Sequence, residues 1–259
     1  MKKSFFLAAM VAGLCLKSVP AQEPSPAAMS AQELAAKLDA VGQGNASIRT
    51  QLAVRTNAGG KRVSQLQIKQ RRTGSTTDLV YLVLWPNDQK GKAVILHQKV
   101  GEAPTGSVIK PPNEVRALKP AEMSEGLFES DLSYQDAVEN FFAWKKQALV
   151  GSEVVDNVKC QILESKPDSA SATIYGKVRS WIDPSRLVPL RIEKYSPSGE
   201  LVRRIDTDRV ARDEKQHNIP AGLVVHGPRK NTVTEFNGAN IKQDVTFTDA
   251  DFTPAALLR

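Results

Sequence analysis

Hydrophobic and polar residues alternate along most of this chain. Ile48, Leu52 and Val54 fall on one side of a two-residue repeat, and Arg49 and Gln51 fall on the other. Similar segments continue almost to the C-terminus, about 12 residues apart and separated by turn-forming residues. Short strands at this spacing are typical of an antiparallel meander, and we predict about eleven of them.

Two segments break this alternation. Leu79 to Trp85 is apolar on both faces, which predicts a strand that is covered on both sides. Pro104 to Met123 is proline-rich and irregular, and we expect it to wrap an edge or rim of the sheet.

The first predicted helix follows a clear start signal. Ser30 to Glu33 fits the capping-box pattern, in which a hydroxyl and a carboxylate each satisfy an exposed backbone N–H. Leu34, Leu38 and Val41 then line one side of the helix, and Gly42 ends it.

A second helical candidate lies between Gly126 and Trp144. Ser133 is the predicted N-cap, with Asp136 three residues further on. The apolar side of this helix is formed by Ala137, Phe141 and Trp144.

These elements predict a mainly β fold of the α+β class. So many strands with two or three helices would leave a wide apolar face exposed, and sheets of that size curl. A curled sheet either fills its interior with side chains or encloses a cavity. Only 6% of the residues are aromatic, so the predicted concave face carries mainly Leu, Ile and Val. Such walls suit flexible acyl chains, and they suit an ordinary core equally well.

The N-terminal residues are typical of a cleaved secretory signal. Lys2 and Lys3 precede the apolar stretch Phe5 to Leu16, and small residues then lead to a predicted cleavage after Ala21. Two alternatives stay open, namely an uncleaved N-terminal anchor and a lipoprotein signal with lipidation at Cys15.

The chain is thus predicted to have three parts: a signal peptide (1–21), a flexible tether (22–29) and a single domain (30–259). We expect the mature protein to be periplasmic, soluble and monomeric. The full chain has 35 basic and 28 acidic residues, and loss of the three lysines of the signal leaves a net charge of +4. This charge is spread along the chain, unlike the clusters of nucleic-acid binders, so we expect no nucleic-acid partner.

Local groups of basic residues change this picture little. Lys69, Arg71 and Arg72 lie beside a predicted turn, and Arg203 and Arg204 lie within a predicted strand. We interpret both groups as solvated strand faces. Contact with an anionic membrane surface is the alternative.

The sequence offers no recognisable catalytic chemistry. His97, His217 and His226 lie far apart and have no carboxylate or cysteine partners at metal-ligand spacing. Phosphate-loop, zinc and nucleophile-elbow motifs are missing from the sequence as well. Cys160 alternates with Val158 and Ile162, as a small buried hydrophobic residue would. We therefore predict a protein that is not an enzyme and needs no cofactor or metal.

One stretch of the chain carries a family resemblance. Gly126 to Asp136 reads Gly-Leu-Phe-Glu-Ser-Asp-Leu-Ser-Tyr-Gln-Asp. This is similar to the Leu-Phe-Gly-Ser-Asp-Phe-Ser-Tyr-Glu-Asp signature of the LolA-like outer-membrane lipoprotein-sorting family. The likeness continues through Ala148–Glu153, Cys160–Pro167, Tyr175–Lys177, Trp181–Asp183, Glu193–Tyr195 and Ser198–Leu201, and covers roughly residues 120–210.

The chain departs from that signature at Glu129, where the family usually has glycine. If this position requires a positive φ, glutamate makes the turn costly.

The resemblance implies an incomplete β-barrel whose antiparallel sheet wraps around helices packed at its concave side. It also implies an apolar cavity that receives lipid or lipoprotein acyl chains, with inner-membrane export machinery and an outer-membrane acceptor as partners. No catalytic residue is transferred. We predict a cavity wall formed by Leu52, Val54, Leu66, Ile68, Leu82, Leu84, Val94 and Leu96. The candidate lid residues are Leu132, Ala137, Phe141 and Trp144.

The leading functional hypothesis is a periplasmic lipid or lipoprotein carrier. A second hypothesis is an envelope-stress sensor with the same fold that binds a membrane-anchored protein partner. A third is a structural envelope protein whose interior is simply filled.

Overall fold

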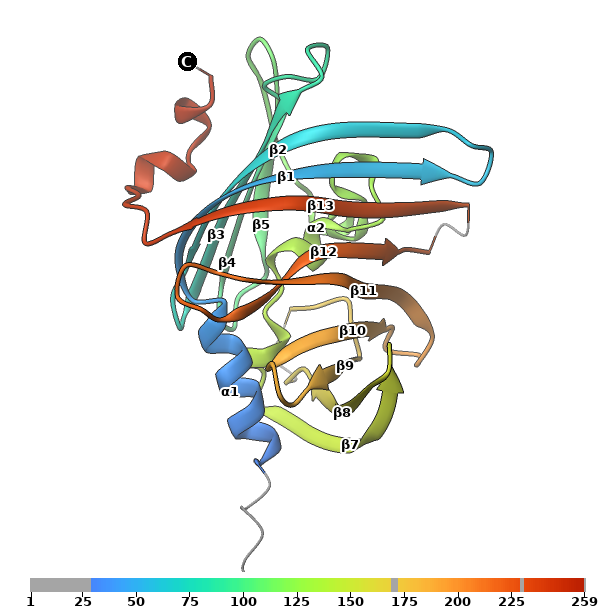
Figure 1. Ribbon diagram of the computed structural model, residues 1–259. Coiled ribbons are helices and arrows are strands. Elements are labelled where there is room, and N and C mark those ends of the chain that lie inside the picture. Colours follow the sequence, from blue (N-terminus) through green and yellow to red (C-terminus); the bar gives the residue numbers. More distant parts are fainter. Residues whose placement is uncertain (1–28, 169–171, 229–230, 259) are drawn as a thin grey trace, which may run out of the picture.

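One curled antiparallel sheet dominates the computed structural model, which describes residues 29–168, 172–228 and 231–258 (Figure 1). Thirteen strands of the described residues pair in the order β6-β5-β4-β3-β2-β1-β13-β12-β11-β10-β9-β8-β7. The strands β6 and β7 form the two edges and do not pair with each other, so the sheet stays open. The predicted mainly β, incompletely closed architecture is confirmed. The predicted signal peptide, its cleavage site, Cys15 and all of the predicted tether except Met29 lie outside the described residues.

The strands are β1 (Gly44–Thr56), β2 (Lys61–Arg72), β3 (Thr76–Trp85), β4 (Ala93–Lys99), β5 (Thr105–Lys110), β6 (Glu114–Ala117), β7 (Lys146–Val155), β8 (Val158–Lys166), β9 (Lys177–Asp183), β10 (Val188–Tyr195), β11 (Leu201–Arg212), β12 (Asn218–His226) and β13 (Thr232–Gln243). The helices are α1 (Ala31–Val41), α2 (Tyr134–Val138) and the short 3₁₀ helices η1 (Pro120–Ser124), η2 (Leu127–Glu129), η3 (Phe141–Ala143), η4 (Asp249–Phe252) and η5 (Pro254–Ala256).

Thirteen strands stand against about eleven predicted: β5, β6 and β7 were not predicted because they lack the expected alternation, and two predicted segments near the C-terminus merge in the single strand β13. The edge strand β6 is exposed at every residue, and β7 is exposed at most of them. The strands β5 and β6 lie in the segment that the prolines marked as irregular. Pro111 and Pro112 instead occupy the connection between these two paired strands. A proline pair between strands is compatible with a tight connection and does not exclude the strands themselves.

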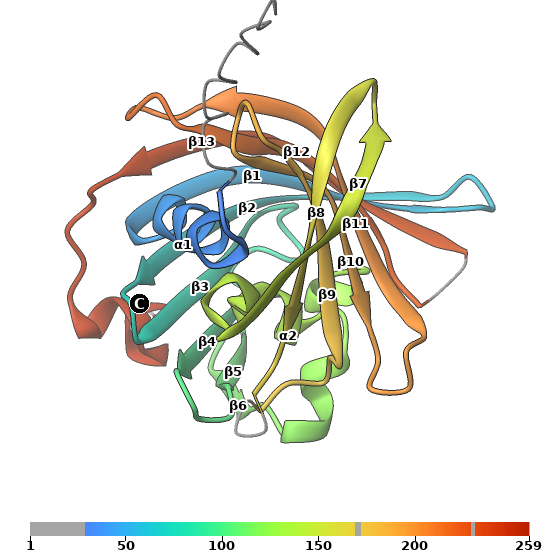
Figure 2. The same cartoon turned by 90° about the horizontal axis from the view of Figure 1, so that it is seen from below.

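The order of the strands explains the path of the chain across the interior. β6 and β7 are neighbours in sequence but lie at opposite edges of the sheet. Their connection, residues 118–145, must therefore pass from one edge to the other. It does so on the concave side, where it carries α2 (Figure 2). We call residues 118–145 the crossing segment.

Helix α1 forms as predicted. Ser30 Oγ accepts a hydrogen bond from the Glu33 amide at 3.2 Å, and the Glu33 carboxylate accepts one from the Ser30 amide at 2.9 Å. Leu34 and Leu38 are buried against Leu163 of β8 and Ile182 of β9. The helix thereby covers β8 and β9, and the Gly42 carbonyl oxygen that follows it accepts a hydrogen bond from Gln70 of β2 at 3.1 Å.

The C-terminal segment covers the outer face of β3 to β5, which explains why β3 is apolar on both faces. Phe252 packs against Val80 and Ile95 in an outer cluster. Asp251 accepts a 2.8 Å hydrogen bond from Lys69, and Asp249 accepts one of the same length from Arg71. The predicted coverage of this strand on both sides is thus confirmed. The interpretation of Lys69 and Arg71 as merely solvated is wrong, because they hold the C-terminal segment to the sheet.

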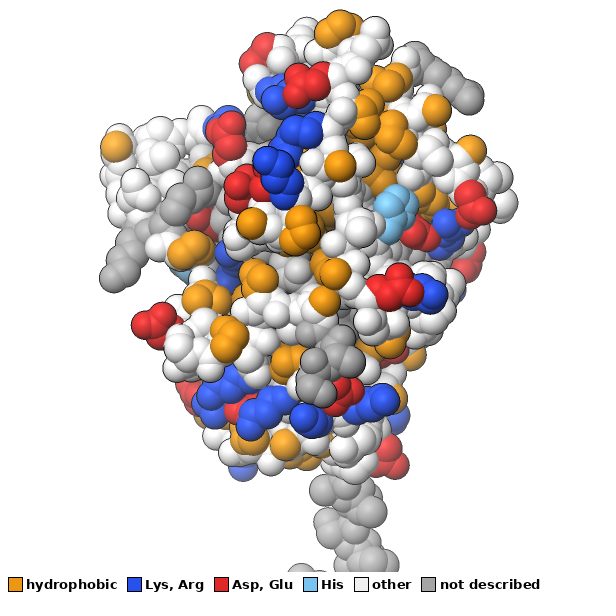
Figure 3. Space-filling view, turned by 180° about the vertical axis from the view of Figure 1, so that it is seen from behind, with side chains coloured by type: hydrophobic (Ala, Val, Ile, Leu, Met, Phe, Trp, Pro, Cys, Tyr) orange, Lys and Arg blue, Asp and Glu red, His pale blue; other side chains and the backbone are white. Residues whose placement is uncertain are grey.

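The surface carries charges of both signs. Figure 3 shows acidic and basic side chains dispersed over one face, with a row of Lys and Arg side chains near its lower end. None of the helices within the described residues has the length and apolar character needed to cross a bilayer.

Candidate functional site

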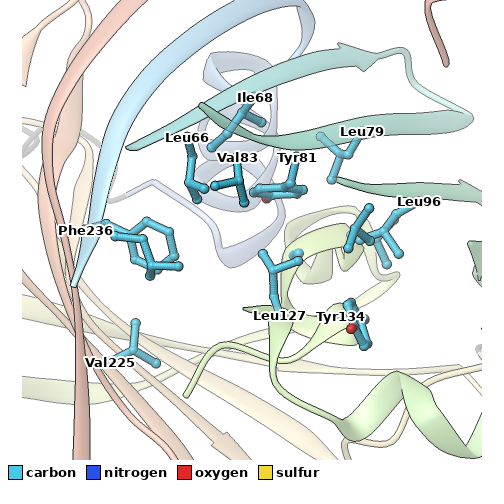
Figure 4. Packing of buried hydrophobic residues seen from close by; sticks show 14 of the residues in the cluster. Leu66, Ile68, Leu79, Tyr81, Val83, Leu96, Leu127, Tyr134, Val225 and Phe236 are labelled. Carbon is cyan, nitrogen blue, oxygen red and sulfur yellow. The ribbon is translucent and has the colours of Figure 1, made fainter. Parts of the chain in front are cut away.

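An apolar cluster fills the concave side of the sheet (Figure 4). Leu66, Val83 and Leu96 reach it from β2, β3 and β4, and Val225 and Phe236 reach it from β12 and β13. We call this set the interior cluster; it consists of Leu52, Leu66, Ile68, Leu79, Tyr81, Val83, Val94, Leu96, Met123, Leu127, Tyr134, Ala137, Val138, Ile205, Val225 and Phe236.

The crossing segment supplies the centre of this cluster. Leu127 and Tyr134 point from the crossing segment toward the strand residues in Figure 4. Met123, Ala137 and Val138 join them, and all five side chains are buried. The apolar wall of the sheet is therefore covered by a segment that lies across it, rather than by a second sheet.

Five of the eight predicted wall residues belong to the interior cluster: Leu52, Leu66, Ile68, Val94 and Leu96. Val54 is buried as well but lies outside that cluster, beside a hollow lined by Arg62 and Glu129. The structure thus gives the positions of these side chains, and ligand binding by them stays a prediction.

The predicted placement of Leu82 and Leu84 on the concave wall is wrong. Leu82 is paired with Gln67 and packs in the outer cluster with Phe252. Leu84 falls at a register shift between β2 and β3 and is not part of the interior cluster. Tyr81 and Val83 take their place, since side chains of successive strand residues point to opposite faces.

The predicted lid residues lie in two groups. Leu132 and Ala137 pack in or against the interior cluster. Phe141 and Trp144 pack on each other, with ring centroids 6.3 Å apart. The predicted second helix is shorter than expected, because α2 ends at Val138 and η3 follows as a separate turn. Its predicted cap is confirmed: Ser133 Oγ accepts from the Asp136 amide at 3.0 Å.

Asp136 also anchors the crossing segment to the sheet. Its carboxylate is fully buried and accepts hydrogen bonds from Lys194 Nζ at 2.7 Å, from Tyr175 Oη at 2.6 Å and from the Arg203 guanidinium. Burial alone would raise the pKa of Asp136, but Lys194 and Arg203 outweigh it and lower the pKa to about 2. The carboxylate is therefore ionised throughout the ordinary pH range.

The register of the sheet explains why this carboxylate is needed. Lys194 of β10 and Arg203 of β11 lie directly opposite each other, and both side chains are buried. Like charges in opposite positions repel, and Asp136 lies between them as their shared partner. The interpretation of Arg203 as a solvated residue is wrong for this reason.

A second acidic residue attaches the same segment to β13. Asp131 is buried, and its carboxylate accepts hydrogen bonds from Thr232 Oγ1 at 2.7 Å and Thr234 Oγ1 at 2.8 Å. Arg203 also donates to the Asp131 carbonyl oxygen at 2.7 Å. We call Asp131, Asp136, Lys194 and Arg203 the polar clamp. The clamp fixes the crossing segment to β10, β11 and β13. The apolar residues of the segment pack against β2 to β4.

The turn at Phe128 and Glu129 is strained, as the departure from the family signature suggested. Glu129 has a φ of 59° and Phe128 a φ of 50°, both in the left-handed region. This conformation favours glycine because a Cβ atom is unfavourable there. The positive φ on which the expectation about Glu129 depended is present, and its cost stays a prediction. The ion pair of Glu129 with Arg62 is exposed on both sides and contributes little.

We therefore expect Glu129→Gly to raise the free energy of unfolding by about 1 kcal/mol. Chemical denaturation would measure this change. Glu129→Ala is the matched control, since it removes the same ion pair and keeps the Cβ atom. A Glu129→Gly protein that is no more stable than the Glu129→Ala protein would contradict the strain at this turn.

The described residues hold no group of three or more His, Cys, Asp or Glu side chains that could bind a metal ion. Cys160 is buried, as its alternation predicted, and packs with Trp181 and Val188.

Comparison with known proteins agrees with this geometry. A family model with the description of an uncharacterized protein matches residues 75–259. No curated protein matches the chain. A DUF1329 family protein from Desulfovibrio piger has a TM-score of 0.79 and 21% identity, over 88% of this chain and 97% of its own.

Two further solved structures share the fold. One is an outer membrane lipoprotein-sorting protein domain, described as putative, from Vibrio parahaemolyticus, with a TM-score of 0.78 and 18% identity over 88% of this chain and 98% of its own. The other is a LolA superfamily protein from Nitrosomonas europaea, with a TM-score of 0.70 and 18% identity over 88% of this chain and all of its own (100%).

Proposed function

We propose that this chain, which belongs to the family whose model matches residues 75–259 and has a LolA-like fold, is a periplasmic carrier that shelters the acyl chains of lipids or lipoproteins. The observation that carries the proposal is the interior cluster, whose sheet wall is covered, among the residues that the structure describes, by the crossing segment. A wall of this kind can exchange one apolar cover for another without breaking any pairing of strands.

Burial of an acyl chain supplies the binding energy. Each methylene removed from water contributes about 0.8 kcal/mol, so an apolar trough needs few polar contacts to hold a chain. The side chains of Met123, Leu127 and Val138 occupy such a trough. An acyl chain would take their place while the crossing segment moves aside.

The polar clamp gives the crossing segment a fixed point during that movement. Asp131 and Asp136 attach one part of the segment to β10, β11 and β13 through buried hydrogen bonds. Contacts with β2 to β4 are mostly apolar and non-directional. The polar contacts on that side include the exposed bonds of Arg62 to Phe128 and Glu129 and the long bond of Arg72 to Ala137. We infer that the segment opens on the side of β2 to β4 and stays attached at the clamp. Release of cargo to an acceptor reverses this exchange, and no catalytic group is required.

The function can be tested by binding of a fluorescent fatty acid to the mature protein, together with analysis of co-extracted lipid. We expect Val83→Gln to weaken binding of the probe about tenfold, because it places an amide on the apolar wall. Leu82→Gln is the matched control, since it makes a similar change one residue away on the outer face. Equal effects of both substitutions would argue against binding on the concave side. The carrier function would be refuted if the protein carried no co-extracted lipid and did not bind the probe.

A second candidate function, a sensor module that binds a membrane-anchored protein, is favoured by one observation. The edge strand β7 exposes Leu149, Val150 and Val154, with Val154 63% exposed. Apolar side chains on an open edge strand favour contact with another protein. A pull-down that retains a membrane-protein partner with the wild type and loses it with Val154→Lys would favour this module. Transient transfer of lipid to a membrane acceptor would favour the carrier.

A further inference from the structure

A second apolar space lies beside α1. It is a hollow of about 250 Å³ between α1, η3 and the first residues of β10 and β12. Most of its lining is apolar and includes Leu38, Phe142, Leu187, Val188, Ile219 and Pro220. These residues come from α1, from the crossing segment, from β10 with the residue before it and from β12, and Arg72 of β2 completes the lining from the other half of the sheet order.

One cationic side chain lies at this hollow. Arg72, the last residue of β2, lines it, and its Nε is buried without a hydrogen-bond partner among the described residues. The only hydrogen bond found for its guanidinium there is a long one of 3.5 Å to the Ala137 carbonyl oxygen of α2. No carboxylate of the described residues lies within ion-pair distance of Arg72, although Asp39 also lines the hollow.

The surroundings of Arg72 leave room for a ligand. Arg72 is paired with Gly44 of β1, which offers no cross-strand side chain, and with the short side chain of Thr77 on β3. The nearby carboxylate of Asp39 accepts hydrogen bonds from Gln43 and Asn140, each at 2.7 Å. Burial lowers the pKa of Arg72, and Tyr81 and Asp39 oppose this only in part. A guanidinium whose Nε is buried without a partner is unfavourable unless an anion completes it.

We propose that this hollow binds the anionic headgroup of an amphiphile, with Arg72 as its ion partner and the apolar lining along the first part of its chain. This inference rests on the proposed function, which it deepens by naming the class of cargo. A guanidinium matches the two oxygens of a carboxylate or a phosphate through paired N–H donors. Since Arg72 also contacts α2 through Ala137, the chain can continue from the hollow into the space that the crossing segment vacates.

The test compares three displacers with the same alkyl chain, namely dodecanoate, dodecyl phosphate and dodecanol, against a bound fluorescent fatty acid. We expect both anions to displace the probe at least tenfold more effectively than dodecanol from the wild-type protein. In Arg72→Gln the ratio of displacement by each anion to displacement by dodecanol should fall to nearly one, while the affinity for dodecanol stays unchanged. The order of the two anions distinguishes a fatty acid from a phosphate headgroup.

Two variants control for charge and geometry. Arg71→Gln removes the same charge from the neighbouring residue, whose side chain bonds to Asp78 and Asp249 instead, and it should keep the preference. Arg72→Lys keeps the charge but loses the paired donors, so it should retain about a third of the preference. Arg72→Gln should leave the thermal midpoint nearly unchanged, because the guanidinium gives up only one long hydrogen bond of 3.5 Å and an unpartnered Nε.

The possible failures are distinguishable. If the wild-type protein binds all three displacers equally, or if Arg72→Gln keeps the preference for anions, the headgroup site is refuted and the carrier function stands. If none of the three displaces the probe and no lipid co-purifies, the proposed function fails and the headgroup site fails with it.

Discussion

Replacement of Asp136 by asparagine should lower the free energy of unfolding by about 2–5 kcal/mol. The substitution preserves the shape of the side chain but leaves Lys194 and Arg203 buried and opposite each other without a carboxylate. Removal of one partner from a buried ionic group is costly because the remaining charges stay desolvated. Denaturant titration of both proteins measures the difference.

An exposed ion pair provides the control for this substitution. Asp249→Asn removes a carboxylate that bonds to Arg71 at 2.8 Å, and that carboxylate is 95% exposed. We expect its effect to stay below about 1 kcal/mol. If Asp136→Asn were as mild as Asp249→Asn, the polar clamp would not be what holds the crossing segment to the sheet.

The same carboxylate makes stability depend on pH. The pKa of Asp136 is about 2 in the folded protein, below its ordinary value of 3.8. A lowered folded pKa means that the stabilisation is complete above about pH 4 and is lost as the pH falls toward 2. This part amounts to about 2 kcal/mol. The wild-type protein should therefore lose its advantage over Asp136→Asn in this window, and a constant difference between pH 5 and 2 would contradict the assignment.

The residues of the concave wall were predicted correctly in strands whose polar residues identify the outer face. Leu66 and Ile68 of β2 alternate with Gln65, Gln67 and Lys69, so their side of the sheet could be assigned. The run Leu79 to Trp85 contains no such marker. Which of its residues face inward depends on the pairing with β2 and on the C-terminal segment that covers the other side, and neither is visible locally.

The polar clamp could not be predicted for a similar reason. Lys194 and Arg203 lie in strands with ordinary alternation, where a basic residue normally faces water. Their partner Asp136 is 58 and 67 residues away in sequence, and its capping role already accounted for its presence at that position. Only the crossing of residues 118–145 from one edge to the other brings these groups together. The family signature contains both Asp131 and Asp136, and this was the one available signal.

Replacement of Leu127 by alanine should have two effects of opposite sign. Leu127 is fully buried in the interior cluster, so its truncation should lower the free energy of unfolding by about 2–5 kcal/mol. It should also tighten binding of an acyl probe, since the crossing segment then competes less well for the apolar wall. Affinity rises in proportion to the fraction of molecules that are already open.

Leu34→Ala separates this mechanism from simple destabilisation. Leu34 is equally buried but packs between α1 and β8, in a different cluster. It should lose a similar amount of stability and leave affinity for the probe unchanged. If Leu127→Ala bound the probe more weakly than wild type, Leu127 would be part of the binding wall. Tighter binding in Leu127→Ala, and not in Leu34→Ala, would identify the crossing segment as the cover that an acyl chain displaces. Only a side chain that competes with the ligand for the wall can, when truncated, lower the free energy of unfolding and raise the affinity for the probe.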